Sequence, residues 1–139
     1  MNKRTLLFAA LCLVIGSAVL QADGQTGGVK VKIPFNFMFG DKTYPAGEYE
    51  FSTAKDTVIV QDSEGTRLAM SMANHVTGRS AGKNGRVIFE CYLDQCFLSQ
   101  IWTPDQDNGH QMLRSRMENR VATKQTGKYM ALLGTGSQQ

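Results

Sequence analysis

The sequence predicts a mainly β fold, an antiparallel β-sandwich or small barrel of about seven strands with one short C-terminal helix. Two observations support this class. Apolar and polar residues alternate over residues 29–39, which is the period of a strand with one buried face. Further short apolar runs follow, separated by turn residues such as Gly, Pro, Asn and Asp. Such spacing is typical of antiparallel strands joined by tight turns.

The alternating run over residues 29–39 is the clearest strand signal in the chain. Its apolar positions include Phe35 and Phe37, which we expect to face the core, because a slip of one residue would exchange the two faces of the strand. Pro34 cannot donate a ladder hydrogen bond, so we expect a sheet edge or a bulge at that position. The positions expected to face solvent are Lys30, Lys32 and Asn36.

Six more strands are expected, at residues 48–51, 57–61, 66–72, 86–92, 96–102 and 129–133. The segments at 74–85 and 103–110 are rich in Gly, Ser, Asn and Asp and are predicted to be loops. We interpret four methionines as fillers of the core, because this flexible side chain adapts to irregular gaps. They are Met70, Met72, Met112 and Met117.

One helix of about ten residues is predicted after Ser115. Ser115 and Glu118 have the spacing of a capping box, Met117 and Val121 share one helical face, and Gly127 is expected to end the helix in a left-handed conformation. The basic residues of this segment are interpreted as a solvated helix face and not as a nucleic-acid patch. They are Arg114, Arg116, Arg120, Lys124 and Lys128.

Residues 1–22 have the features of a secretory signal peptide. Lys3 and Arg4 precede an uncharged apolar run at residues 6–15, which is too short for a membrane span, and small residues follow. We therefore expect a secreted or periplasmic protein without a transmembrane span in its mature form. Residues 23–28 are predicted to be a flexible leader, 29–133 a single β-rich domain, and 134–139 a disordered tail.

Cys91 and Cys96 are the cysteines that remain after signal cleavage, and an exported protein meets conditions that permit oxidation. If Leu93 and Asp94 form a two-residue turn, the two cysteines face each other across a hairpin within reach of an S–S bond. We predict a disulfide between them. Two free thiols and a redox-active pair are the alternatives, although the spacing is not Cys-x-x-Cys.

No catalytic set, metal site or cofactor site is predicted. His75 and His110 are the two histidines of the chain, and neither has another ligand at short spacing. A hydrolytic triad could be assembled from Ser71, His75 and Asp105, or from Ser99 with His110. Nothing singles these residues out, because the chain has no nucleophile-elbow motif.

Four aromatic residues could line a ligand surface, such as a sugar platform or the mouth of a barrel that holds a lipid. Aromatic side chains in a domain of this size are more often part of the core, and this alternative stays open. The four residues are Tyr44, Tyr49, Tyr92 and Trp102.

Four segments together resemble a group of small secreted bacterial proteins of unknown function, with the pattern VPFxF, LPAGxY, FLSQxW and SxxE. The segments are IPFNF, YPAGEY, FLSQIW and SRME, beginning at Ile33, Tyr44, Phe97 and Ser115. The resemblance covers most of the chain after residue 22 and implies a β-rich exported domain with no established activity. Cys91 and Cys96 depart from that pattern, and no functional residue is carried over.

Composition and charge leave binding as the expected function. Fifteen basic residues stand against twelve acidic ones, a formal net charge of +3, without the concentrated basic face of a nucleic-acid binder. We expect an exported, non-enzymatic β-domain that binds an envelope protein, a polysaccharide or a small apolar ligand. A small secreted hydrolase with an unrecognised site is the alternative.

Overall fold

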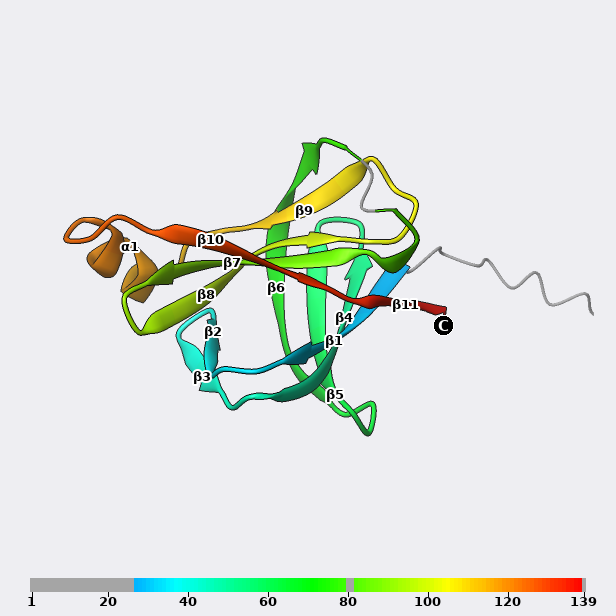
Figure 1. Ribbon diagram of the computed structural model, residues 1–139, viewed down its shortest axis with the longest axis horizontal. Helices are drawn as coiled ribbons and strands as arrows, with labels where there is room; N and C mark the ends of the chain where they lie inside the picture. The colour runs from blue at the N-terminus through cyan, green and yellow to red at the C-terminus, as the bar shows by residue number, and fades with distance from the viewer. Residues whose placement is uncertain (1–26, 80–81, 139) are drawn as a thin grey trace, which may run out of the picture.

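A computed structural model describes residues 27–79 and 82–138 of the chain. The predicted signal peptide and residues 23–26 of the predicted leader lie outside these ranges. The described chain is mainly β, with one short helix near its C-terminal end (Figure 1). The first six strands are β1 (Gly27–Ile33), β2 (Phe37–Phe39), β3 (Lys42–Tyr44), β4 (Gly47–Ala54), β5 (Thr57–Asp62) and β6 (Arg67–Thr77). A short 3-10 turn, η1 (Gly82–Asn84), precedes β7 (Arg86–Tyr92), β8 (Gln95–Trp102), β9 (Asn108–Met112), α1 (Arg116–Ala122), β10 (Lys128–Leu133) and β11 (Thr135–Gln138).

The described strands form one open, mostly antiparallel sheet in the order β10-β7-β8-β9-β6-β5-β4-β1-β11, and β2 pairs with β3 and, in parallel, with β8. The sheet does not close into a barrel, since β10 and β11 lie at its two ends. It has eleven strands in the described residues, where about seven were predicted from strand spacing. The additional strands are short or poor in apolar residues.

Two segments connect the half of the sheet formed by β1, β4 and β5 with the half formed by β7, β8 and β9. β6 pairs with β5 as far as Met72 and with β9 from Ala73 onward, so this long strand carries the sheet around the core (Figure 1). At the other side, β10 pairs with β7 and β11 pairs with β1, with Gly134 between them. A side chain at Gly134 would collide with Val29 and with the Lys30 carbonyl. Only glycine lets the C-terminal segment pass this close to β1.

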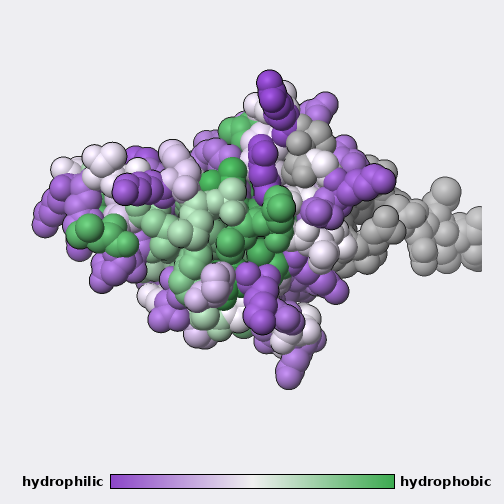
Figure 2. All heavy atoms as spheres, viewed as in Figure 1, coloured by the Kyte–Doolittle hydropathy of each residue, from purple (hydrophilic) through white to green (hydrophobic). Residues whose placement is uncertain are grey.

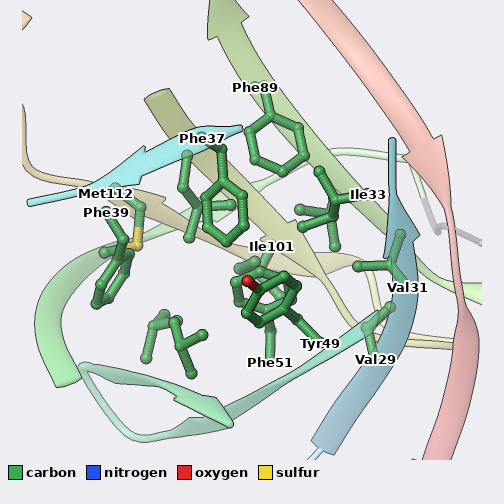
Figure 3. Packing of buried hydrophobic residues seen from close by; sticks show 14 of the residues in the cluster. Val29, Val31, Ile33, Phe37, Phe39, Tyr49, Phe51, Phe89, Ile101 and Met112 are labelled. Atoms are coloured by element: carbon green, nitrogen blue, oxygen red, sulfur yellow. The ribbon is translucent and has the colours of Figure 1, made fainter. Parts of the chain in front are cut away.

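The main hydrophobic core lies inside the curved sheet (Figure 3). Phe37 is fully buried at its centre, with ring centroids 5.0 Å from Tyr49 and 5.6 Å from Phe89. Each aromatic pair contributes about 0.5–1.5 kcal/mol beyond the burial of its area. A smaller cluster of Met38, Tyr92 and Phe97 packs against one side of α1.

The predicted strand at residues 29–39 is divided at Pro34. β1 ends at Ile33 and β2 begins at Phe37, because proline cannot continue the ladder. The predicted faces are confirmed. Phe37 is buried and Phe35 packs partly buried against Phe89, with ring centroids 5.2 Å apart. The exposed residues are Lys30, Lys32 and Asn36.

The prediction that four methionines fill the core is wrong for three of them. Met112 is buried, whereas Met70 is 57% exposed, Met72 is 66% exposed and Met117 is 38% exposed. The cause in β6 is an irregularity between Val60 and Gln61, which shifts the pairing of β5 with β6. The positions opposite the buried residues of β5 are taken by two smaller side chains, Ala69 and Ser71.

The start of the predicted helix is confirmed, and its end is not. Ser115 caps α1, and its hydroxyl accepts a hydrogen bond of 3.1 Å from the Glu118 backbone N–H. The helix has seven residues and ends at Ala122, so Gly127 does not terminate it. Gly127 instead lies where a Cβ atom would collide with Glu90 and Tyr92.

Three predicted irregular segments contain strands. Residues 134–139 were expected to be a disordered tail, but Thr135–Gln138 form β11 on the edge of β1. The predicted loop at 103–110 contains most of β9, and β6 continues through Thr77 into the predicted loop at 74–85. Gly109 in β9 lies under the Trp102 ring, where an added Cβ would come within 2.7 Å of ring atoms.

Candidate functional site

β10 is an edge strand that exposes apolar side chains. It pairs with β7 on one side, and its other edge has no strand partner in the described part of the chain. Tyr129 is 68% exposed, Met130 is 43% exposed and Leu133 is 72% exposed. Hydrophobic residues gather at the centre of the face where β10 leads into β11 (Figure 2). We call Tyr129, Met130 and Leu133, with the open backbone edge of β10, the β10 surface.

The β10 surface lacks the usual protection of an edge strand. Natural edges carry charged residues, prolines or bulges that prevent pairing with another chain. The exposed Lys128 is the charged residue of β10, and residues 129–134 include neither a charge nor a proline. β10 pairs with β7 in a continuous register without a bulge. An exposed edge of this kind marks either a binding site or an aggregation hazard.

A groove of about 610 Å³ adjoins the Leu133 end of the β10 surface. The pairing of β1 with β11 ends at the Lys30–Thr135 pair, and Val31 and Lys32 therefore line the groove beyond the end of that ladder. Both signs of charge meet in its walls, because β1 contributes lysines and β4 contributes Glu48 and Glu50. Its volume falls within the range of about 300–1,000 Å³ that is typical of ligand sites.

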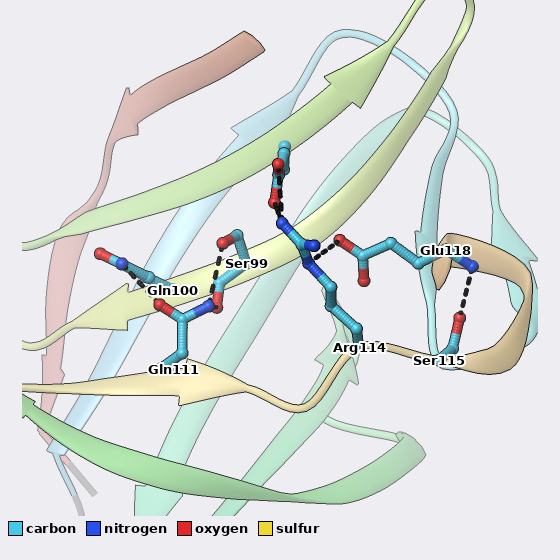
Figure 4. Close-up of polar contacts among 7 residues, drawn as sticks. Ser99, Gln100, Gln111, Arg114, Ser115 and Glu118 are labelled. Carbon is cyan, nitrogen blue, oxygen red and sulfur yellow. Dashed lines mark hydrogen bonds and ion pairs between the residues drawn. The ribbon is translucent and has the colours of Figure 1, made fainter. Parts of the chain in front are cut away.

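A buried ionic cluster lies between β7, α1 and the start of β10. The Arg114 guanidinium donates to both carboxylate oxygens of Glu90 at 3.0 Å, and its Nε lies 3.8 Å from Glu118 (Figure 4). The Glu90 and Glu118 side chains are almost fully buried, whereas Arg114 is about half exposed. The cluster packs against Gly127, one residue before β10, and so helps to fix where β10 begins.

The ionic cluster shifts the pKa values of its members. Burial, followed by repulsion from Glu90, raises the pKa of Glu118 to about 7, while Arg114 and the Ser115 backbone N–H act in the lowering direction. Burial and the nearby Glu90 raise the pKa of Tyr92 to about 12. The buried Tyr92 hydroxyl makes no hydrogen bond of regular length and angle with the described residues. One guanidinium thus serves two carboxylates, and the second is held partly protonated near neutral pH.

The combinations of Ser, His and Asp considered as hydrolytic triads are not assembled. His75 lies next to Asp56, with Nε2 and Oδ1 2.8 Å apart, while the Asp105 backbone bonds to the carbonyl of Gly82 in a separate loop. The Ser99 hydroxyl is buried and accepts a hydrogen bond of 3.3 Å from Gln111. Ser99 therefore belongs to a polar network of β8 and β9 that includes Gln100 and Gln111 (Figure 4). The Trp102 indole N–H joins this network by donating to Gln100.

The four aromatic residues proposed as a ligand surface lie mainly in the interior. Tyr49, Tyr92 and Trp102 are buried, and Tyr44 is half-buried. Tyr44 and Tyr49 pack against Phe37, whereas Tyr92 belongs to the separate cluster beside α1. These positions match the core alternative, and a ligand contact by the four residues remains a prediction.

The predicted disulfide is confirmed. Cys91 and Cys96 are bonded, with Cα atoms 4.0 Å apart, and they face each other in the register of β7 and β8. The bond pins the tip of the β7–β8 hairpin. Cys91 also lies opposite Lys128 at the start of β10, so the disulfide supports the same end of the β10 surface as the ionic cluster.

A scan against protein-family models and searches of curated proteins and of solved structures found no match to this chain. The resemblance to small secreted bacterial proteins therefore stays a prediction. Within residues 27–79 and 82–138, no helix has the length and apolar character needed to cross a membrane.

Proposed function

We propose that this chain is an exported, non-enzymatic domain that binds a partner protein by accepting an extended segment of it as an extra strand on β10. The observation that carries the proposal is the β10 surface, an edge that is uncharged after Lys128 and exposes apolar side chains. Strand addition gains affinity from main-chain hydrogen bonds and specificity from alternate side chains. The open edge of β10 offers main-chain hydrogen bonds. The side chains of Tyr129, Met130 and Leu133 offer the contacts that give specificity.

The surroundings of β10 favour a strand-like partner. The ionic cluster packs against Gly127 just before β10, the disulfide-bonded Cys91 pairs with Lys128, and pairing with β7 keeps the strand extended. A rigid edge binds at a lower entropic cost than one that must be ordered on binding. The groove at the Leu133 end has walls of both charge signs, so we expect the partner segment to be apolar along β10 and polar or charged at that end.

A protein partner is favoured over a polysaccharide or a small apolar ligand. Sugar recognition would be expected to use several exposed aromatic rings, whereas the β10 surface offers one, Tyr129, and Tyr49, Tyr92 and Trp102 are buried. The groove mixes charged with apolar residues, which suits a peptide better than a purely apolar molecule. The alternative of a small hydrolase gains no supporting observation, because the Ser, His and Asp residues considered for it are not brought together.

The test compares two double variants of matched chemistry. Met130→Lys with Leu133→Lys charges the β10 surface, while Met70→Lys with Met72→Lys charges an equally exposed part of β6. Partners are cross-linked in the cells that make the protein and identified by mass spectrometry. The β10 variant should lose a protein that both the original chain and the β6 variant retain.

Three results would contradict the proposal. One is retention of every partner by the β10 variant, and another is loss of the partner only in the β6 variant. The third is a second copy of this chain as the only cross-linked product, lost together with dimerisation in the β10 variant. Thermal unfolding of both variants checks that the fold is intact, which is expected because all four positions are exposed.

A further inference from the structure

The two histidines of the chain meet on neighbouring strands, although 34 residues separate them in the sequence. His75 in β6 lies directly opposite His110 in β9. Their ring centroids are 4.8 Å apart and their planes are tilted by 54°. His75 is more than half exposed, so the pair is accessible to small solutes.

Both imidazoles are oriented by the turn between β4 and β5. The Nε2 atom of His75 lies 2.8 Å from a carboxylate oxygen of Asp56, and the Nε2 atom of His110 lies 2.8 Å from the carbonyl oxygen of Lys55. The turn is fixed to β6 by a hydrogen bond of 2.7 Å from the Ala73 N–H to the Asp56 carbonyl. The two rings are therefore held by one short segment.

These contacts determine where each neutral ring carries its lone pair. A carbonyl oxygen can only accept, so the Nε2 atom of His110 must donate, and its Nδ1 atom is left unprotonated. The Asp56 carboxylate imposes the same tautomer on His75. Metal-binding histidines usually donate their second N–H to a carboxylate or a backbone carbonyl in this way. The pair thus already has the outer hydrogen bonds of a metal site.

The spacing of the rings is compatible with one ion bound between them. With metal–nitrogen bonds of about 2.0–2.1 Å, a bound ion lies about 3.2 Å from each ring centroid. If both Nδ1 atoms bind the same ion, the observed separation of 4.8 Å corresponds to a nitrogen–metal–nitrogen angle of about 95–100°, between square-planar and tetrahedral values. A linear two-coordinate ion would need a separation of about 6.4 Å.

We propose that His75 and His110 bind one divalent first-row transition ion, such as Zn²⁺ or Cu²⁺, through their Nδ1 atoms. Asp56 and the Lys55 carbonyl act as outer partners that orient the rings. No third His, Cys, Asp or Glu is placed to complete the site within residues 27–79 and 82–138, so water fills the remaining positions. Imidazole favours these ions over Mg²⁺ and Ca²⁺, which prefer oxygen ligands.

The test is a Zn²⁺ titration of the protein, purified without a histidine tag, against a chromophoric chelator. Because the chain has two histidines, His75→Gln with His110→Gln removes every imidazole. We expect one Zn²⁺ per chain, at least about tenfold weaker binding in each single histidine variant, and a weakening of about tenfold in Asp56→Asn. Thr77→Ala, an exposed position on the same strand, should bind within about twofold of the original chain.

Unchanged Zn²⁺ affinity in the double histidine variant would overturn the proposal, and so would Mg²⁺ binding as tight as Zn²⁺ binding. Long-range proton–nitrogen NMR of the imidazoles gives a second readout. The metal-free protein should show the Nε2–H tautomer in both rings, and Zn²⁺ should shift the two Nδ1 signals. An Nδ1–H tautomer in either metal-free ring would also refute the site.

Discussion

Replacing Glu118 by Gln should make the protein less sensitive to pH. Glu118 is buried beside Glu90, which already occupies the hydrogen-bonding face of Arg114. The pKa of Glu118 is raised from 4.5 to about 7, first by burial and then by Glu90. The folded chain therefore holds a proton on Glu118 at pH values where the unfolded chain has lost it.

The sign and size of the effect follow from linkage. A raised pKa contributes stability that is fully present below the unfolded pKa of 4.5 and is lost as the pH rises through about 7. At about 1.4 kcal/mol for each tenfold change in proton affinity, the loss amounts to about 3 kcal/mol. The amide of Gln resembles the protonated carboxyl in shape and does not titrate in this range. The stability of Glu118→Gln should therefore not include this pH-dependent loss.

Urea unfolding at several pH values measures the difference. The free energy of unfolding of the original chain minus that of Glu118→Gln should fall by about 3 kcal/mol between about pH 4.5 and about pH 8.5. Glu64→Gln at an exposed turn is the control, and its difference should stay nearly constant. If the difference in free energy of unfolding between the original chain and Glu118→Gln varied by less than about 0.5 kcal/mol over this range, that result would refute the reasoning.

Three further changes test the fold. Phe37→Ala should lower the free energy of unfolding by about 3–5 kcal/mol, because it empties the centre of the core; a loss below about 1 kcal/mol in urea melts would contradict this position. Replacing Cys91 and Cys96 by Ser should cost about 2–3 kcal/mol, since the closed loop is short; alkylation of both thiols without reductant would show that the bond does not form. Gly134→Ala should detach β11 from β1, because the added Cβ atom would collide with Val29, and amide exchange at residues 135–138 should become faster. Unchanged exchange at these residues would contradict the close approach of Gly134 to β1.

The elements that were predicted correctly depend on local patterns. Strict alternation placed Phe37 on the buried face, and the capping box placed the start of α1 at Ser115. The short turn between two strands placed Cys91 opposite Cys96. In each case the residues that define the structural feature lie within a few positions of one another in the sequence. A local sequence pattern is therefore enough to predict the feature.

The elements that were missed depend on distant pairing. β11 consists of small and polar residues and exists because β1 offers an edge to it. β9 lacks apolar alternation and depends on Gly109 lying under the Trp102 ring. The outward position of Met70 and Met72 follows from the irregular pairing of β5 with β6, which no pattern within β6 reveals.

The candidate sites could be predicted only in part. The uncharged run at residues 129–133 was recognised as a strand, but its position at the end of the sheet depends on the strand order. The His75–His110 pair was not foreseen, because neither histidine has a ligand nearby in the sequence. The ionic cluster likewise joins Glu90 of β7 to Arg114, which lies 24 residues later in the sequence.

Amide hydrogen exchange of β10 tests the proposed binding mode most directly. The protein is compared alone and in complex with the partner recovered by cross-linking, and the exchange of residues 128–133 is followed by mass spectrometry. Strand addition predicts slower exchange in β10 on binding, because its free edge gains main-chain hydrogen bonds. Exchange that is unchanged in β10 and slowed elsewhere, for example in the exposed part of β6, would contradict the proposal.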